Sequence, residues 1–458
     1  MFSSENGYSR WKQTGFSGHI IRFKNAMRSL LSKVDNLLSH NAMPYDKLEH
    51  WPPMTYRSRA GSTSEARAAF NDFLKTENQT KQTMELQPWI PFCEGRCAFC
   101  YFPVNCEKQN VSSYIKALKK ALGSYAKNRY VQSSIFSEFY VGGGSPTVLA
   151  EHQIADVLKY CRESFNFSED CITKFTACTN NLSEEKIRLL SSKEVDQLDI
   201  GIQTFDEELR KVLMLRDSGK NAKQKLREVK KHGLKVSIDL LYNLPGQSIV
   251  QWKEDLQQSV ELNLESVDCY PLDLYPDTPL ANRIATGELP PVNGDGKELE
   301  MYLEAYRFFK ENGYSPTCHN RFSRIKEDFN KPSSEVIGTG AGFFMGHIGS
   351  YLYSDIENVE EYITTVQNGV LPIARLAKLS KEDEMRKAMM LIYIRTSVDR
   401  EEFKAKFGKF PEQAFPEAIS RLQKKNLIEV KDGKIHLTEK GDPWRFNIAW
   451  EFFKNSNP

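Results

Sequence analysis

Three cysteines in one short stretch restrict this chain more than any other feature of its sequence. Cys93, Cys97 and Cys100 follow a Cys-x3-Cys-x2-Cys spacing, with Phe99 directly before the third cysteine. Thiolates are the usual ligands of iron–sulfur clusters, so each cysteine can bind one iron of a cubic [4Fe-4S] cluster. The fourth iron then has no protein ligand and can chelate an amine and a carboxylate. S-Adenosylmethionine (SAM) carries both groups.

These cysteines also allow two other interpretations. A structural zinc site needs four closed ligands, usually two cysteine pairs, and Cys106 would have to be the fourth. The resulting Cys-x3-Cys-x2-Cys-x5-Cys pattern is not a usual zinc spacing. A cluster of reactive thiols is the other alternative. The spacing favours iron–sulfur, with Cys106 outside the ligand set.

The composition limits the kinds of partner. Lys and Arg number 62 and Asp and Glu 60 among 458 residues, so the chain has almost no net charge. This balance argues against nucleic acid or an acidic membrane surface as the main partner. Nine cysteines, no convincing signal peptide and no apolar run long enough to span a membrane predict a protein of the reducing cytoplasm.

Residues 1–85 are predicted to form an N-terminal helical and irregular extension. Its segment Ile20–Ser39 has the apolar stripe of an amphipathic helix, which we expect to pack on the main domain. A targeting or membrane-surface helix is the alternative. The following Pro- and Tyr-containing stretches, Met43–Tyr45 and Trp51–Tyr56, are too aromatic for a plain linker. They are predicted to cover the mouth of an active site.

From Leu86 onward, short apolar runs alternate with helical patterns. This alternation is typical of an α/β fold with a parallel sheet, here a partial (β/α)6-type barrel with its chemistry at the carboxyl ends of the strands. The predicted strands are Leu86–Cys93, Ile135–Val141, Lys174–Cys178, Gln197–Gln203, Leu234–Leu241 and Val267–Leu274.

Polar residues follow these strands at or near their ends. The cysteine loop follows the first strand and the run Gly142–Gly144 the second, while Asn180-Asn181, Gln203 and Asp239 belong to the third, fourth and fifth. The glycine run alone can be a tight turn, and it lacks the spacing and lysine of a phosphate loop. Beside the cysteine loop, its backbone groups are predicted to bind the amino group of SAM.

Several segments together resemble the HemN-like branch of the radical SAM superfamily, typified by oxygen-independent coproporphyrinogen III dehydrogenase. The likeness extends from Leu86 to about Ser350 and, more weakly, over the C-terminus. The segments that carry it are Ile90–Cys100, Tyr140–Thr147, Asp199–Phe205, Ile238–Gln247, Tyr270–Leu280 and Glu335–Gly342.

The resemblance implies a radical SAM enzyme with a [4Fe-4S] cluster, one SAM or two, a small-molecule substrate and an electron donor such as flavodoxin or ferredoxin. It assigns Cys93, Cys97 and Cys100 to the cluster. It assigns SAM contacts to Gly143, Gly144, Ser145, Gln203, Arg216 and Asp239. Arg216 lies one residue further from Gln203 than the family spacing. For Asp239 a loop-capping role is the structural alternative, and for Gln203 polar packing between strands.

The chain also departs from coproporphyrinogen dehydrogenases. Gln87 stands where they carry a Tyr six residues before the first cysteine, and Cys178 where they carry a Glu on the third strand. Tyr101-Phe102 replaces the Gly-Cys that follows their third cysteine, and Asn243 replaces a Gly. These changes predict a different substrate.

Residues 86–375 are predicted to form the barrel with a family-specific insert, and residues 376–458 a winged-helix-like cover. Helices are predicted over Lys381–Ile394, Glu401–Phe407 and Phe415–Lys425, and the Asp432-Gly433 turn predicts a hairpin. Winged helices often bind DNA, but this one is not strongly basic. The family carries such a module as a lid, so no nucleic acid is expected.

In this branch three outcomes are known as family properties: oxidative decarboxylation of porphyrinogen propionates, methyl transfer or cyclopropanation with a second SAM, and haem carriage without catalysis. The substituted site and the aromatic extension favour methyl transfer or cyclopropanation on a tetrapyrrole or natural product, with the other two as alternatives. No catalytic acid or base can be named. His319, His347, Cys269 and Cys318 are further candidates, for which structural roles are the commoner explanation.

Overall fold

The computed structural model describes residues 43–51, 63–79, 84–107, 109–318, 320–325 and 335–454. Contacts divide the chain into two units, Met1–Lys47 and Leu48–Pro458, and the described helices and strands belong to the second. The predicted helix Ile20–Ser39, most of the stretch Trp51–Tyr56 and His319 lie outside the described residues. Helix α3 (Ser64–Leu74) was not predicted, and the Thr63 hydroxyl caps it by accepting from the Ala66 amide at 3.2 Å.

The core of the fold is a parallel sheet whose first six strands lie side by side in chain order. This sequential arrangement confirms the predicted α/β fold with parallel strands. The predicted ends differ from the observed ones by a few residues, except that the third strand begins earlier. The strands are β1 (Met84–Ile90), β2 (Phe136–Gly143), β3 (Phe167–Ala177), β4 (Gln197–Gln203), β5 (Lys235–Tyr242) and β6 (Ser266–Pro271).

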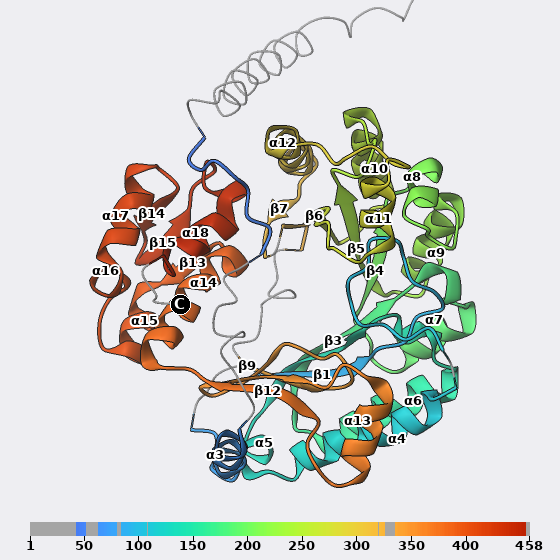
Figure 1. The fold of residues 1–458 in the computed structure, drawn as a ribbon, viewed down its shortest axis with the longest axis vertical. Coiled ribbons are helices and arrows are strands. Elements are labelled where there is room, and N and C mark those ends of the chain that lie inside the picture. Colours follow the sequence, from blue (N-terminus) through green and yellow to red (C-terminus); the bar gives the residue numbers. More distant parts are fainter. Residues whose placement is uncertain are drawn as a thin grey trace, which may run out of the picture. The chain divides into compact units, whose positions relative to one another are not determined.

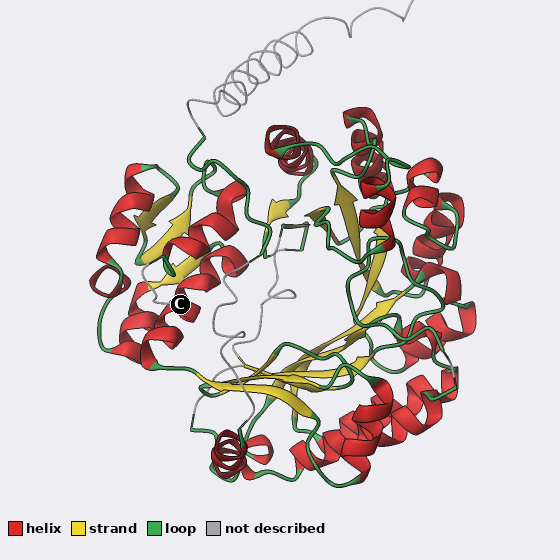
Figure 2. Cartoon of the chain, in the orientation of Figure 1, coloured by secondary structure: helices red, strands yellow, loops and turns green. Residues whose placement is uncertain are grey.

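The two faces of this sheet differ in polarity because side chains alternate along a strand. On β5, Val236, Ile238 and Leu240 are fully buried, whereas Ser237 and Asp239 point to the other face. Figure 1 and Figure 2 show the sheet as curved, with the connecting helices along its outer side. The apolar side chains therefore pack under the helices, and the polar ones lie on the concave face.

The helices that cover the outer side have the apolar stripe expected for this position, as in α9, where Ala222, Leu226 and Val229 are buried. Most begin at a side-chain cap, such as Ser248 of α10, which accepts from the Gln251 amide. The barrel helices are α4 (Val111–Ala126), α5 (Arg129–Gln132), α6 (Glu151–Ser164), α7 (Glu184–Ser192), α8 (Glu207–Val212), α9 (Gly219–Lys231), α10 (Ile249–Glu261), α11 (Pro279–Ala285) and α12 (Asp295–Glu311).

Further strands extend the sheet at both ends. β7 (Ser315–Pro316) and β8 (Arg321–Ser323) follow β6, and β9 (Glu335–Thr339) pairs in parallel with β1. β1 is thus hydrogen-bonded on both sides. Beyond β9 lie three antiparallel strands and helix α13 (Val359–Gln367): β10 (Gly346–Ile348), β11 (Tyr351–Asp355) and β12 (Ile373–Lys378).

The C-terminal elements confirm the predicted helices and hairpin. The hairpin turn has positive φ at Asp432 (50°) and Gly433 (76°), as a two-residue turn between twisted strands requires. A short strand before it, β13, was not predicted. The elements are α14 (Lys381–Arg395), β13 (Ser397–Asp399), α15 (Arg400–Phe407), α16 (Pro411–Ala414), α17 (Pro416–Lys424), β14 (Ile428–Lys431), β15 (Lys434–Leu437) and α18 (Arg445–Glu451).

Candidate functional site

The cysteine loop leaves the sheet at the carboxyl end of β1. Cys93, Cys97 and Cys100 are each partly exposed. The loop is tied to its surroundings by backbone bonds: the Cys93 amide donates to Asn105 O at 3.0 Å and the Ala98 amide to Leu213 O at 2.9 Å. The three thiols are therefore held on one anchored loop with access to small molecules.

The glycine run after β2 packs directly against this loop. A side chain at Gly143 (φ 126°) would collide with the Ile90 backbone, and a Cβ at Gly144 would lie 2.8 Å from Cys93 Sγ. The Gly144 and Ser145 amides donate to Ile90 O and Phe92 O, both at 2.8 Å. An ammonium group donates hydrogen bonds, so only the carbonyl oxygens of this run could bind it. The SAM contact of the run stays a prediction.

Burial and mutual repulsion hold the cluster thiols in the protonated form when nothing is bound. Burial first, and then the neighbouring Cys100 and Cys97 thiolates, raise the pKa of Cys93 to about 12. Burial likewise raises the pKa of Cys97 to about 12, against the opposing effect of Arg210 and Arg216. A bound metal centre supplies the positive charge that such thiolates need.

A hydrogen-bonded network joins the cysteine loop to the end of β3. Asn180, in the turn after β3, donates from Nδ2 to the Glu94 carboxylate of the loop, and its Oδ1 accepts from the Cys178 thiol at 2.5 Å. The Cys178 amide donates to Thr147 Oγ1 at 3.0 Å. The charge of a Cys178 thiolate also contributes to the raised pKa of both Cys93 and Cys97.

The three remaining residues predicted to contact SAM lie at the end of β4, within β5 and against the cysteine loop. Gln203 ends β4 with φ 67°, and its amide folds over Gly201. Asp239 lies three residues before the end of β5, where burial, then Asp268, raise the pKa of its carboxyl well above the usual range. The Arg216 guanidinium lies against Gly95 of the cysteine loop. A Cβ at residue 95 would collide with this guanidinium.

Two family domains match this sequence. Residues 88–258 match the Radical SAM superfamily and residues 379–444 the HemN C-terminal domain. The chain is a HemN-like radical SAM protein. The solved structure of coproporphyrinogen III oxidase (HemN) from Escherichia coli, described as a radical SAM enzyme, has the same fold, with a TM-score of 0.75 and 21% identity over 85% of this chain and 94% of that one.

Curated relatives of this HemN-like protein are named for different functions. It is 26% identical to heme chaperone HemW of Bacillus subtilis (77% of this chain, 94% of the relative) and 25% identical to anaerobilin synthase of Escherichia coli O157:H7 (78% and 81%). It is 23% identical to oxygen-independent coproporphyrinogen III oxidase of Helicobacter pylori 26695 (81% and 85%). Each of these relatives covers between 77% and 81% of this chain.

Membership of the superfamily implies a [4Fe-4S] cluster and SAM, and the residues present fit both. Three thiols share one loop, and Gly144 leaves space beside Cys93. Among the described residues, no three His, Cys, Asp or Glu side chains gather as ligands of one metal ion. The thiolates of a cubic cluster each bind a different iron, so they need not converge on a single point.

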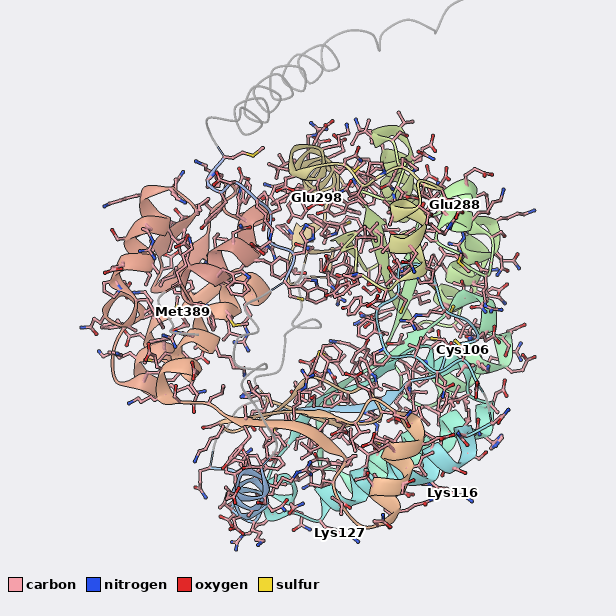
Figure 3. All side chains as sticks on the ribbon, viewed as in Figure 1. Cys106, Lys116, Lys127, Glu288, Glu298 and Met389 are labelled. Carbon is pink, nitrogen blue, oxygen red and sulfur yellow. The ribbon has the colours of Figure 1, made fainter. Side chains whose placement is uncertain are left out.

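The other cysteines and the histidine that the sequence singled out as possible functional residues differ in burial and in their neighbours. Cys269 is fully buried in the core, and Cys318 is also buried. His347 lies on β10, 2.7 Å from Lys387 Nζ of α14. Cys106, labelled in Figure 3, is exposed, yet it lies near enough to raise the pKa of Cys93.

Sequence reasoning missed one polar cluster near the site. His50 Nε2 lies 2.6 Å from Glu298 Oε1 of α12, also labelled in Figure 3. Burial lowers the pKa of His50, but Asp273 and Glu298 together outweigh it and raise the pKa to about 9. Tyr101 directly follows Cys100 in the sequence, and the ring of Trp51 contacts it edge-on, with ring centroids 5.8 Å apart. His50 and Glu298 are 248 positions apart, so no local pattern could reveal the pair. The predicted covering role of the aromatic stretch stays a prediction.

Among the helices that the structure describes, none combines the length and the apolar composition needed to cross a bilayer.

Proposed function

We propose that this HemN-like protein is a radical SAM enzyme that acts on a tetrapyrrole. The observation that carries the proposal is the anchored three-thiol loop packed against Gly144, which suits a cluster with one iron open to SAM. The substrate class is supported by relatives named for heme and for coproporphyrinogen.

In this proposal Cys93, Cys97 and Cys100 hold the cluster, and the residues of the same sheet edge hold SAM. Carbonyl groups of the Gly143–Ser145 turn accept from the SAM ammonium, and Gln203, Asp239 and Arg216 contact the rest of the molecule. With cluster and SAM bound, the cofactors supply a radical that removes hydrogen from an unreactive C–H bond. The protein positions the substrate and excludes water.

Oxidative attack on a tetrapyrrole side chain, such as decarboxylation of a propionate, is the reaction we favour. The oxidase relative supports it, and so does the likeness in fold to coproporphyrinogen III oxidase. The relatives give the predicted methyl transfer or cyclopropanation no support. The second SAM, an electron donor of the flavodoxin or ferredoxin class and a cytoplasmic location remain part of the proposal.

Haem carriage without catalysis is the second candidate. Two relatives named heme chaperone, those of Bacillus subtilis and Lactococcus lactis, match this chain over 94% and 95% of their own lengths, which favours it. The substitution of Cys178 for the family's Glu, beside the cluster thiols, also distinguishes this site from that of the oxidases.

Anaerobic reconstitution with iron and sulfide, followed by dithionite, SAM and either a porphyrinogen or haem, separates these functions. The proposal expects 5′-deoxyadenosine together with a modified porphyrinogen. Stoichiometric haem binding without any SAM-derived product would establish the carrier instead. S-Adenosylhomocysteine formed together with 5′-deoxyadenosine would restore methyl transfer.

A further inference from the structure

Four consecutive residues, Leu48–Trp51, bind several separate parts of the described fold and are here called the strap. Two of their bonds reach the first turn of helix α12. The Leu48 amide donates to Asp295 Oδ2 at 3.1 Å, and His50 Nε2 lies 2.6 Å from Glu298 Oε1. One end of a barrel helix is therefore held by a segment from the beginning of the chain.

The strap also binds helix α18 of the C-terminal module. The Glu49 amide donates to Asn447 Oδ1 at 3.1 Å. Trp450 Nε1 donates to the carbonyl oxygen of Trp51 at 2.9 Å. Because the neighbouring strap residues bind α12, these four residues connect the C-terminal module with the barrel.

The ion pair between His50 and Glu298 is the strongest of these contacts. Glu298 is 5% exposed, and its second oxygen accepts from Asn243 Nδ2 at 2.8 Å. Burial lowers the pKa of His50, but Asp273 and Glu298 together raise it to about 9, so the ring is charged at neutral pH. A carboxylate removed from water needs a cation or several donors. Glu298 thus depends on the strap for its positive partner.

Asn243, which replaces a Gly of the coproporphyrinogen dehydrogenases, positions this carboxylate. Its backbone has φ 61°, a region that Gly and Asn both tolerate. Besides the bond to Glu298, Nδ2 donates to Asn293 O at 3.1 Å, and Oδ1 accepts from the Asn293 amide at 3.0 Å and from Asn293 Nδ2 at 3.1 Å. Two donors and two acceptors are all that an amide side chain offers. Asn243 therefore has no polar group left for a substrate.

Tyr101, which also replaces a Gly of those enzymes, meets the other end of the strap. Its ring stacks on Tyr275 with centroids 4.1 Å apart, and Trp51 contacts both rings edge-on, at 5.8 Å and 6.5 Å. Trp51 Nε1 also donates to Asp273. Since Tyr101 directly follows Cys100, the Trp51 indole packs beside the residue next to a cluster thiol.

We propose that the strap fastens the C-terminal module to the barrel and shields the cysteine loop, with Asn243 and Tyr101 as its docking points. Asn243 and His50 are then positioning residues that act through Glu298 and Trp51. The two replacements of Gly serve the closure of this chain and not the choice of its substrate. This role goes beyond the proposed function and is the same for any substrate, because no contact described above involves one.

Asn243→Gly tests the proposal, because it keeps the backbone conformation favourable and removes the side chain that holds Glu298. The first readout is hydrogen exchange of peptides from the strap in the full-length protein without cluster. The second is the rate at which the reconstituted [4Fe-4S] cluster loses its visible absorbance in air-saturated buffer without SAM. We expect both rates to rise about tenfold, since a hydrogen bond to a buried charge is lost. His50→Gln provides a second variant if Asn243→Gly does not fold.

Asn426→Gly is the matched control. Asn426 follows α17 and has φ 56°, so the replacement changes the backbone in the same way at a residue that takes no part in the contacts above. It should change neither rate. If it accelerates both as much as Asn243→Gly, general destabilisation explains the result and the proposal is refuted.

Variants of Trp51 separate shielding from fastening. Trp51→Ala should speed the loss of absorbance, and Trp51→Phe should restore the original rate to within about twofold, because a phenyl ring can keep the edge-on contact. Faster exchange of the strap in Asn243→Gly without faster loss of the cluster would refute the shielding.

The remaining outcomes distinguish the strap from a substrate site. If Asn243→Gly leaves both rates unchanged but alters KM, Asn243 belongs to the substrate site and the proposal fails. If no cluster assembles in the unmodified protein, the proposed function fails, while exchange of the cluster-free protein still decides whether Asn243 holds the strap.

Discussion

The two faces of the central sheet are made by the same strands and serve different ends. The convex face is apolar and closed by helices, as at Leu198, Ile238 and Phe175, which are at most 1% exposed. On the concave face, buried polar atoms of described residues, such as Gln87 Oε1 and Ser237 Oγ, have no hydrogen-bond partner. One face thus packs apolar side chains against helices, whereas the other keeps polar side chains inside the fold. Mutation of neighbouring residues on one strand should therefore change stability by very different amounts.

The largest expected effect is a difference in iron content between variants of two cysteines, Cys97 and Cys161. Cys97→Ser should abolish incorporation of the cluster and SAM cleavage while leaving the fold intact, because Cys97 lies on a loop outside the sheet. Cys161→Ser, in the fully buried core, should keep the iron content but lower the melting temperature. Iron analysis and thermal unfolding measure both. Full iron content in Cys97→Ser would remove this residue from the ligand set.

A second pair tests the two faces on one strand. Ile238→Ala should lower the free energy of unfolding by about 3 kcal/mol, because it leaves a cavity under the helices. Ser237→Ala, its neighbour on the concave face, should change it by less than about 0.5 kcal/mol, since the lost hydroxyl has no partner. Chemical denaturation gives both values. Similar losses would show that both faces are used for packing.

The third prediction concerns pH. Burial first, and then Glu138, raise the pKa of Glu85 to about 7, above the value of an unfolded Glu. The folded state therefore holds a proton that the unfolded state has released, and stability is lost as the pH rises from about 4.5 through 7. Glu85→Gln should raise the melting temperature more at pH 8 than at pH 5. Equal shifts at both values would show that Glu85 is ionised throughout.

The smallest effect is expected at Gly433, remote from both faces, where φ is 76°. Gly433→Ala should cost about 1 kcal/mol of stability and leave SAM cleavage unchanged, because only the hairpin turn is strained. Thermal unfolding and a cleavage assay provide the check. A change in cleavage would connect the C-terminal hairpin with the site.

The sequence allowed the parallel strands β1–β6 to be predicted because each is a short apolar run with a clear end. It did not reveal β9, although β9 pairs with β1, since the partners are about 250 residues apart and a parallel contact leaves no local pattern. The alternation of polar and apolar side chains at Ser237, Ile238 and Asp239 could be predicted from the sequence. The lack of hydrogen-bond partners for buried polar atoms on the concave face could not, because it depends on which strands pair in the sheet.

The same limit applies to the candidate site. The cysteine spacing and the glycine run identified neighbours that the structure places in contact, as at Gly144 and Cys93. The bond from Asn180 to Glu94 and the closeness of Cys178 to the cluster thiols follow from how β3 ends beside β1's loop, across an intervening strand. Individual residue roles at this edge remain proposals.

Strand β1, which precedes the cysteine loop, is hydrogen-bonded to β2 on one side and to β9 on the other. The Tyr114 hydroxyl also donates to Trp89 O of β1 at 2.7 Å. Damage by oxygen that strips the iron would thus leave the framework standing, with only the loop disturbed. We therefore expect the protein to be repairable: fresh iron and sulfide can be reinstalled without refolding, and a single polypeptide can outlast several clusters.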